Sequence, residues 1–172
     1  MFLRPRDVLE RISIPAGSRV GDFGSGAGHF ALGIIDRLGP ETTVYAFDAL
    51  APVLAKLSRE AKRRGGKLYA IEADLNVHIP VADNLLHFAI LANILHAVSN
   101  RERFLSELAR VVRPGGRALV IDWTASFKNM GPTAGAVVTP SQAVRLLGAA
   151  GFSANDMLPA GSHHWAFLAT LR

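Results

Sequence analysis

Short apolar runs alternate along the chain with longer segments in which apolar residues recur every three or four positions. The runs predict strands and the periodic segments predict helices. Strands that alternate with helices are typical of an open, mainly parallel sheet with helices on both faces, which is an α/β fold. The predicted strands are 18–23, 43–47, 67–72, 86–92, 116–122, 154–159 and 165–171, and the predicted helices are 5–12, 28–38, 51–64, 100–112 and 140–150.

The last two predicted strands are joined differently from the others. Only the short segment Gly161–His164 separates them, and a helix cannot cross over in so few residues. We therefore expect a hairpin, so that a sheet of parallel strands ends in one antiparallel strand.

A glycine-rich turn follows the first predicted strand. That strand contains Asp22, and Gly24, Gly26 and Gly28 follow at alternate positions. Glycine accepts positive φ and lets a ligand approach main-chain atoms. The dinucleotide fingerprint Gly-x-Gly-x-x-Gly places its third glycine one residue later, where this chain has His29. An acid just before the glycines is unfavourable beside a pyrophosphate but suits a ligand with an ammonium or sulfonium charge, so the turn predicts such a cofactor.

The segment from Asp22 to Gly28 resembles the first motif, Asp/Glu-x-Gly-x-Gly-x-Gly, of the class I S-adenosylmethionine-dependent methyltransferases. Asp48 at the end of the second strand, Asp74 after the third, and the turn Pro114-Gly115-Gly116 before the fifth also resemble that family. The resemblance covers about residues 5–171. It implies a three-layer α/β/α sandwich with seven strands in the order 3-2-1-4-5-7-6, the last strand antiparallel, in a single domain of residues 1–172.

The resemblance also implies a cofactor and its contacts. S-adenosylmethionine would bind and leave as S-adenosylhomocysteine. Asp48 would accept hydrogen bonds from the ribose hydroxyls, Asp74 and the amide of Leu75 would meet the adenine edge, and the main chain near Asn93 would hold the methionine portion. The predicted cofactor residues are Asp22, Gly24, Ser25, Gly26, Gly28, His29, Asp48, Ala49, Asp74, Leu75, Ala92 and Asn93.

The same strand order predicts which residues face the methyl acceptor. The hairpin that carries His164 should lie beside Asp122, and His96 should lie across the same opening. A histidine can take a proton from the acceptor, and Asp122 can orient that histidine or bind a cationic amine. We therefore predict His96, Asp122 and His164 as catalytic residues. Trp123 or Trp165 could hold a flat or cationic acceptor.

Adjacent residues of a regular hairpin strand face opposite sides, so at most one of His163 and His164 should face the opening. We predict no metal site, because the spacing of these His and Asp residues carries no ligand signature. The chain has no cysteine, which excludes disulfides and thiolate chemistry.

Charge and hydropathy limit the classes of partner that we expect. The net charge is +5, but the densest basic run, 56–67, falls on a predicted amphipathic helix and has no aromatic residues among its charges. This pattern indicates a solvated helix face and does not favour nucleic acid. No apolar segment is long enough to cross a bilayer, so we expect a cytoplasmic protein that makes no membrane contact.

Residues 124–139 form the one insertion long enough to cover the opening, and its Gly and Pro content suits a mobile lid in which Phe127, Lys128 and Met130 could meet the substrate. The acceptor itself is not identified. The ends of the fourth and fifth strands favour a small molecule, while a protein or RNA acceptor, or a homodimer that completes the site, stays open.

Two other functions also stay open. The domain could bind S-adenosylmethionine without turnover, as an interaction module. An NAD(P) oxidoreductase is disfavoured by the glycine spacing and by the lack of a Tyr-x-x-x-Lys constellation.

Overall fold

The computed structural model describes residues 2–127 and 130–172. It contains one seven-stranded sheet in the order β3-β2-β1-β4-β5-β7-β6, in which β7 alone among these strands runs antiparallel to its neighbours β5 and β6. This confirms the predicted α/β class, strand order and final hairpin. The strands are β1 (Arg19–Phe23), β2 (Thr43–Asp48), β3 (Lys67–Glu72), β4 (Leu86–Ala92), β5 (Val112–Trp123), β6 (Phe152–Leu158) and β7 (His164–Leu171).

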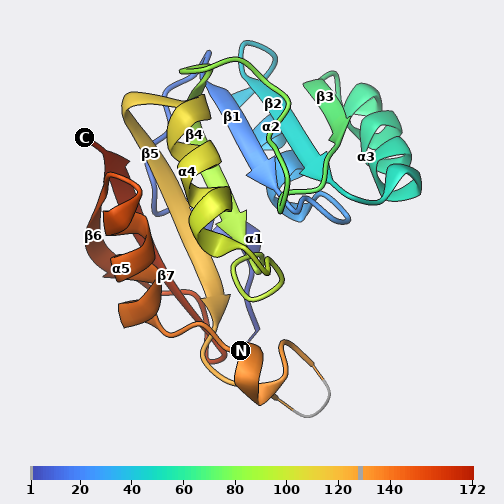
Figure 1. Ribbon diagram of the computed structural model, residues 1–172. Coiled ribbons are helices and arrows are strands. Elements are labelled where there is room, and N and C mark those ends of the chain that lie inside the picture. Colours follow the sequence, from blue (N-terminus) through green and yellow to red (C-terminus); the bar gives the residue numbers. More distant parts are fainter. Residues whose placement is uncertain (1, 128–129) are drawn as a thin grey trace.

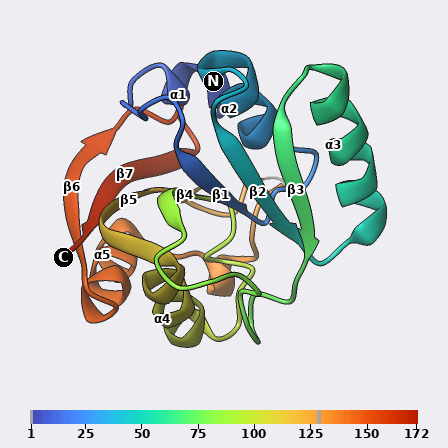
Figure 2. The same cartoon turned by 90° about the horizontal axis from the view of Figure 1, so that it is seen from above.

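The helices cover the two faces of the sheet unequally, as Figure 2 shows. α1 (Pro5–Leu9), α2 (His29–Leu38) and α3 (Ala51–Arg63) lie on one face, and α4 (Arg101–Val111) and α5 (Pro140–Ala149) lie on the other. Each layer buries its own hydrophobic cluster, the first around Ile34 and Leu57 and the second around Phe104 and Leu147. The predicted three layers are therefore present.

Two predicted boundaries were wrong by three residues or more. α1 ends at Leu9 and not at residue 12, because the guanidinium of Arg37 binds the carbonyls of Leu9 and Ile12 and holds the chain in a turn. β5 begins at Val112 and not at residue 116, because residues 113–116 bulge out between two segments that both pair with β4.

Figure 1 shows the arrowheads of β1, β4 and β5 pointing to one end of the molecule, where the N-terminus and the short 3-10 helix η1 (Ala134–Ala136) also lie. The predicted ligand-binding turn follows β1 at this same end. The carboxyl ends of the parallel strands are where open α/β sheets bind ligands, so the site is sought there.

Arg110 of α4 anchors the connection between β3 and β4, residues 73–85, which has no helix of its own. Its guanidinium donates to the carbonyls of Ile79 and Val81 at 2.7 and 2.9 Å, and to Glu107 and Asp83. The bond from Arg110 is the largest cause that lowers the pKa of Glu107 to about 2. One side chain thus closes this connection onto α4.

We expect Arg110→Ala to lower the free energy of unfolding by about 2 kcal/mol, because two carbonyls and two carboxylates lose a charged donor that is only partly screened by water. Urea unfolding followed by circular dichroism measures this. Arg63→Ala is the matched control, since Arg63 bonds only to the neighbouring Glu60 on the exposed side of α3, and it should leave the midpoint nearly unchanged. Equal midpoints for the two variants would contradict the anchoring role.

Candidate functional site

Main-chain hydrogen bonds hold the glycine-rich turn against the end of β2. The amides of Gly24 and Ser25 both donate to the carbonyl of Phe47 at 2.9 Å. The amide of Gly26 donates to Asp48 Oδ2 at 2.8 Å. These bonds draw the turn across the carboxyl ends of two adjacent strands.

Two glycines of this turn show why side chains are excluded. Gly28 has a φ of 80°, and a Cβ there would lie 2.2 Å from Leu57 Cδ1 of α3. Gly26 has a φ of 49°, and the nearest atom to a Cβ there would be the carbonyl oxygen of Gly24 at 3.9 Å. The side of the turn at Gly26 therefore faces open space, and a ligand can approach its main chain.

Asp22 of β1 caps α2 from outside the helix. The N-cap residue Gly28 has no side chain to offer, and Asp22 Oδ2 accepts a hydrogen bond from the amide of Ala31 at 3.1 Å. Burial raises the pKa of Asp22 to about 7; the Ala31 hydrogen bond opposes this rise and the nearby Asp48 carboxylate adds to it. A cationic ligand beside Asp22 would favour its ionised form.

Asp22 should make the stability of the ligand-free protein depend on pH. Its pKa is 3.8 when exposed and about 7 in the folded protein, so the folded state binds more protons between these values. The contribution of Asp22 to the free energy of unfolding therefore falls as the pH rises from about 4 to about 7, and then levels off. We expect Asp22→Asn to remove this fall and to raise the melting temperature at about pH 8 more than at about pH 5, as measured by scanning calorimetry.

Other carboxylates do not disturb this test. Hydrogen bonds from Arg63 and Arg64 lower the pKa of Glu60 to about 2, and Arg110 does the same for Glu107. These two acids stabilise the folded protein fully when the pH is above 4.5, which is the ordinary pKa of a glutamate. Their stabilisation is lost only as the pH falls below that value. A wild-type pH slope in Asp22→Asn would contradict the assignment to Asp22.

A cavity of about 440 Å³ opens beside the turn. Among the described residues, the buried polar side-chain atoms that lack a hydrogen-bond partner are Ser25 Oγ, Asn93 Oδ1 and both ring nitrogens of His164, and all three residues line this cavity. Buried polar atoms are normally paired, so their convergence indicates a polar ligand. Asn93 also has a φ of 58°, an uncommon value for a residue with a side chain that is found repeatedly at functional sites.

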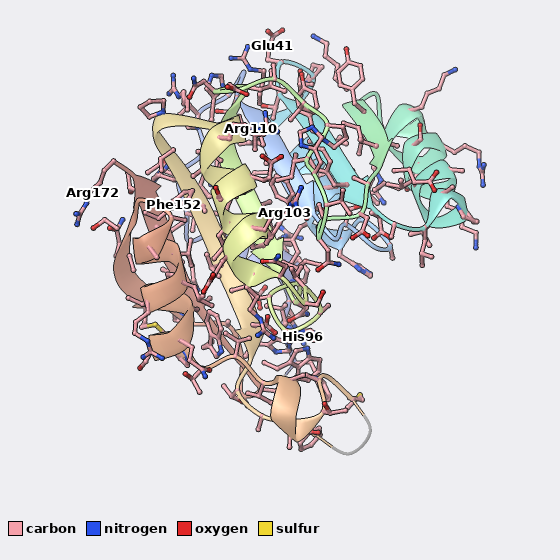
Figure 3. All side chains as sticks on the ribbon, in the orientation of Figure 1. Glu41, His96, Arg103, Arg110, Phe152 and Arg172 are labelled. Atoms are coloured by element: carbon pink, nitrogen blue, oxygen red, sulfur yellow. The ribbon has the colours of Figure 1, made fainter. Side chains whose placement is uncertain are left out.

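His96 and Asp122 form a hydrogen-bonded pair just beyond the ends of β4 and β5. His96 Nδ1 lies 2.6 Å from Asp122 Oδ1, and the main-chain amide of His96 donates to Oδ2 at 3.1 Å. Asp122 is buried, and the His96 side chain is 17% exposed near the carboxyl edge of the sheet (Figure 3). Because a carboxylate only accepts, Nδ1 carries the proton and Nε2 is left as the basic nitrogen.

His164 lies against Trp123 at the cavity wall. These two residues are opposite each other in the β5–β7 pairing, and their ring centroids are 4.2 Å apart. Burial lowers the pKa of His164; Asp122 raises it, and the histidines at 163 and 96 lower it again. His164 is therefore neutral near neutral pH and can exchange one hydrogen bond with a ligand through each ring nitrogen.

A comparison with known families agrees with this geometry. A family model described as "Methyltransferase domain" (Methyltransf_11) matches residues 21–120, more than half of the chain. The chain belongs to the class I S-adenosylmethionine-dependent methyltransferases. S-adenosylmethionine is the cofactor of this family.

Individual methyltransferases are similar to this chain in structure or in sequence. The crystal structure of a SAM dependent methyltransferase from Aquifex aeolicus matches with a TM-score of 0.88 and 26% identity over 99% of this chain and 91% of that one. The demethylmenaquinone methyltransferase of Geobacillus kaustophilus is 27% identical over 117 residues, which are 67% of this chain and 50% of the relative. The arsenite methyltransferase of Halobacterium salinarum is 27% identical over 154 residues, which are 83% of this chain and 39% of the relative. The chain thus spans half the length or less of these two curated relatives.

The cavity fits the cofactor of the family. The cavity is bordered by the open face of Gly26 and by unpaired donor and acceptor atoms, which suit the hydroxyl, amine and carboxylate groups of S-adenosylmethionine. The predicted cofactor residues that line it are Asp22, Gly24, Ser25, Gly26, His29, Ala92 and Asn93.

The remaining predicted cofactor residues lie farther along the same edge of the methyltransferase sheet. Asp48 ends β2 and is joined to the cavity through Gly26, while Asp74 lies in the exposed turn after β3. The Leu75 side chain is buried in the core, so only its main chain can face a cofactor. Ala49 is exposed beside Asp48, and Gly28 is the N-cap residue of α2.

Of the two tryptophans predicted as alternative acceptor contacts, Trp123 lines the cavity and Trp165 does not. Trp165 does not line the opening; its side chain is buried, donates to the carbonyl of Val138 at 3.0 Å and stacks on Phe167 under α5. It lies opposite Asp122 in β7, one residue from His164, and strand alternation therefore sends its side chain to the other face of the sheet. The same alternation separates His164, in the cavity wall, from His163, which packs on Phe127 outside it.

The described residues of the predicted lid, 124–127 and 130–139, approach the cavity wall at Trp123. A Cβ at Gly131 would come within 2.6 Å of the Trp123 ring, and the amide of Thr124 donates to the carbonyl of His163 at 2.9 Å. Lys128, one of the predicted substrate contacts, falls outside the described residues. Movement of this segment as a lid stays a prediction.

The sequence missed part of the methyltransferase cavity. Phe2, Leu3 and Pro5 of the N-terminal segment line it, as does Phe30 of α2. Apolar residues before a short helix carry no signal of their own, and only the packing of α1 on α2 brings them over the turn. The Phe2 ring packs at a tilt on His163, with ring centroids 5.1 Å apart, on this side of the cavity.

Two negative findings concern the part of the methyltransferase that the structure describes. Within residues 2–127 and 130–172, no group of three His, Cys, Asp or Glu side chains is arranged to hold a metal ion. None of the helices in those ranges has the length and apolarity needed to cross a membrane.

Proposed function

We propose that this chain binds S-adenosylmethionine and transfers its methyl group to a small-molecule acceptor, releasing S-adenosylhomocysteine. The observation that carries the proposal is that Ser25, Asn93 and His164, each with an unpaired buried polar atom, all line the cavity bordered by the glycine-rich turn. The His96–Asp122 pair at the same sheet edge adds a base. Family membership supports the reaction class.

The cofactor contacts follow from the ends of the strands. Asp48 already accepts amide hydrogen bonds from Gly26 and Leu50 on its two oxygens, which orient the carboxylate, and each oxygen keeps a lone pair for a ribose hydroxyl. Asp74 and the Leu75 amide would meet the adenine edge. Asp22, once ionised, would favour the positive charges of the methionine portion.

On the acceptor side, the bound cofactor would supply an electrophilic methyl carbon attached to a sulfonium sulfur. His96 Nε2 would accept the proton that the acceptor atom loses as it attacks. Asp122 would hold the imidazole in the required tautomer and stabilise the imidazolium that forms. His164 would hydrogen-bond the acceptor, and Trp123 would provide a flat wall for it.

Two observations support a small molecule as the acceptor. Aromatic side chains of Phe2 and Trp123 border the cavity. The related proteins named above methylate demethylmenaquinone and arsenite. A single domain, a homodimer and a cytoplasmic location stay predictions.

The test is calorimetric titration of the protein with S-adenosylmethionine, S-adenosylhomocysteine and NAD, followed by transfer of a labelled methyl group to a panel of hydroxylated quinones, phenols, arsenite, protein and RNA. We expect both adenosyl ligands to bind, NAD not to bind, and a small molecule to be labelled. Binding of NAD alone would overturn the cofactor. Tight binding with no label on any acceptor would favour the non-catalytic module, and labelled protein or RNA would overturn the small-molecule acceptor.

A further inference from the structure

The Asn76 side chain joins two segments that carry different parts of the proposed site. Its Nδ2 donates to Asp74 Oδ1 at 3.0 Å. Its Oδ1 accepts from the amide and the hydroxyl of Ser99, at 2.9 and 2.8 Å, and from the amide of Asn100 at 3.2 Å. One amide group therefore spans from the turn after β3 to the segment between β4 and α4.

The second of these segments carries His96. It runs from the end of β4 to Asn100, the N-cap of α4. His96 in its middle is held at Asp122 through both its main-chain amide and its ring. Asn76 thus binds one end of the segment, and Asp122 binds its middle.

An amide is the group that these surroundings require. Three donors face Oδ1 and a carboxylate faces Nδ2, so the side chain must accept on one side and donate on the other. A carboxylate at this position would keep the acceptors but repel Asp74. An alkyl group would take the shared acceptor from Ser99 and Asn100. Asp74 would then keep only its bond from the main-chain amide of residue 76, so the side-chain link between the two segments would be lost.

Other contacts hold the surrounding fold without Asn76. The guanidinium of Arg103 donates to the carbonyl of Val77 at 2.9 Å, and Arg110 binds the same connection farther on. The Asn100 side chain caps α4 by accepting from the amide of Arg103. The loss of the Asn76 side chain should therefore affect the end of the connection nearest the site and leave its attachment to α4 intact.

We propose that Asn76 is a positioning residue that couples the adenine-side acid Asp74 to the segment that holds His96. The inference rests on the proposed function for its catalytic consequence, but the coupling itself is a property of the ligand-free protein. When Asn76 holds both segments, the cofactor end and the base end of the site keep one geometry.

The coupling is tested by hydrogen exchange of the ligand-free Asn76→Ala protein. The amides of Ser99 and Asn100 lose their acceptor and must exchange faster. The proposal further requires the amide of His96, which is bonded to Asp122, to exchange about tenfold faster, because the whole segment loosens. Faster exchange at Ser99 and Asn100 alone would overturn the coupling, and this result does not depend on whether the protein binds S-adenosylmethionine.

Measurements of the affinity for S-adenosylmethionine and of kcat give a second test of the proposal. Asn76→Asp keeps the acceptors for Ser99 and adds a charge beside Asp74, so we expect a dissociation constant for S-adenosylmethionine about tenfold higher, with kcat at saturation nearly unchanged. Asn76→Ala should raise that constant and also lower kcat about tenfold. The control is Asn155→Asp, which adds the same charge on β6, and it should change neither value. If Asn76→Asp and Asn76→Ala changed kcat equally, Oδ1 and Nδ2 of Asn76 would not have separate roles, and this part of the proposal would be overturned.

Discussion

Replacing Asp48 with alanine will raise the dissociation constant of S-adenosylmethionine by about 100-fold or more. Two hydrogen bonds from ribose hydroxyls to a charged oxygen contribute about 1.5–3 kcal/mol each, and every 1.4 kcal/mol corresponds to about a factor of ten. The variant also removes the acceptor of the Gly26 amide, so the turn itself loses an anchor. Titration calorimetry on the purified variant measures the loss.

Two comparisons make the Asp48 result specific. S-adenosylhomocysteine carries the same ribose, so its affinity should fall by the same factor. Asp36→Ala removes the same charge from the exposed side of α2, where Asp36 pairs with Arg64, and should leave the affinity unchanged. Unchanged binding in Asp48→Ala, with a wild-type melting temperature, would remove Asp48 from the cofactor site.

Asp122→Asn will lower kcat by about 100-fold or more while the affinity for S-adenosylmethionine changes little. General base catalysis contributes about 100-fold to 10,000-fold, and it depends on the tautomer of His96. An asparagine can turn its amide nitrogen toward His96 Nδ1 and so stabilise the tautomer with the proton on Nε2. Single-turnover methyl transfer to the acceptor identified by the panel measures the effect.

His96→Ala should reach about the same residual rate, and the double variant should be no slower, because residues that act as a unit lose their effect together. Asp7→Asn, an exposed exchange of the same type on α1, is the control for the loss of a carboxylate. Asp122 is buried, so the melting temperature is measured alongside. A His96→Ala protein that retains the wild-type kcat would show that another group, or water, takes the proton.

The cofactor side of the site is the part that sequence patterns predicted best. The turn at Gly24–Gly28 and the acids that end β1 and β2 are close in sequence to the strands that place them, so local chemistry indicated them directly. The parallel strands then bring these ends to one edge, because right-handed crossovers leave little freedom in such a sheet. The observed strand order confirms the fold and family membership confirms the cofactor, while the individual cofactor contacts stay predictions.

The acceptor side was predicted less completely. Strand order correctly placed His164 beside Trp123 and brought His96 near Asp122, but it did not show that Nδ1 would bind the carboxylate or that both nitrogens of His164 would be buried without a partner. The prediction put Trp165 on the wrong face of the sheet. The face on which a strand residue lies depends on the register of that strand, and hydrophobic periodicity alone does not set the register.

The sequence by itself determined the class of fold, the glycine turn and the chemistry of a cationic cofactor, since these depend on residues that are neighbours along the chain. Tertiary structure alone decided which side chains share the cavity, that the N-terminal Phe2 helps to line it, and that Asn76 links Asp74 to the His96 segment. The physical reason is that hydrogen bonds and burial between segments far apart in the chain depend on side-chain packing, and no local pattern of residues specifies that packing.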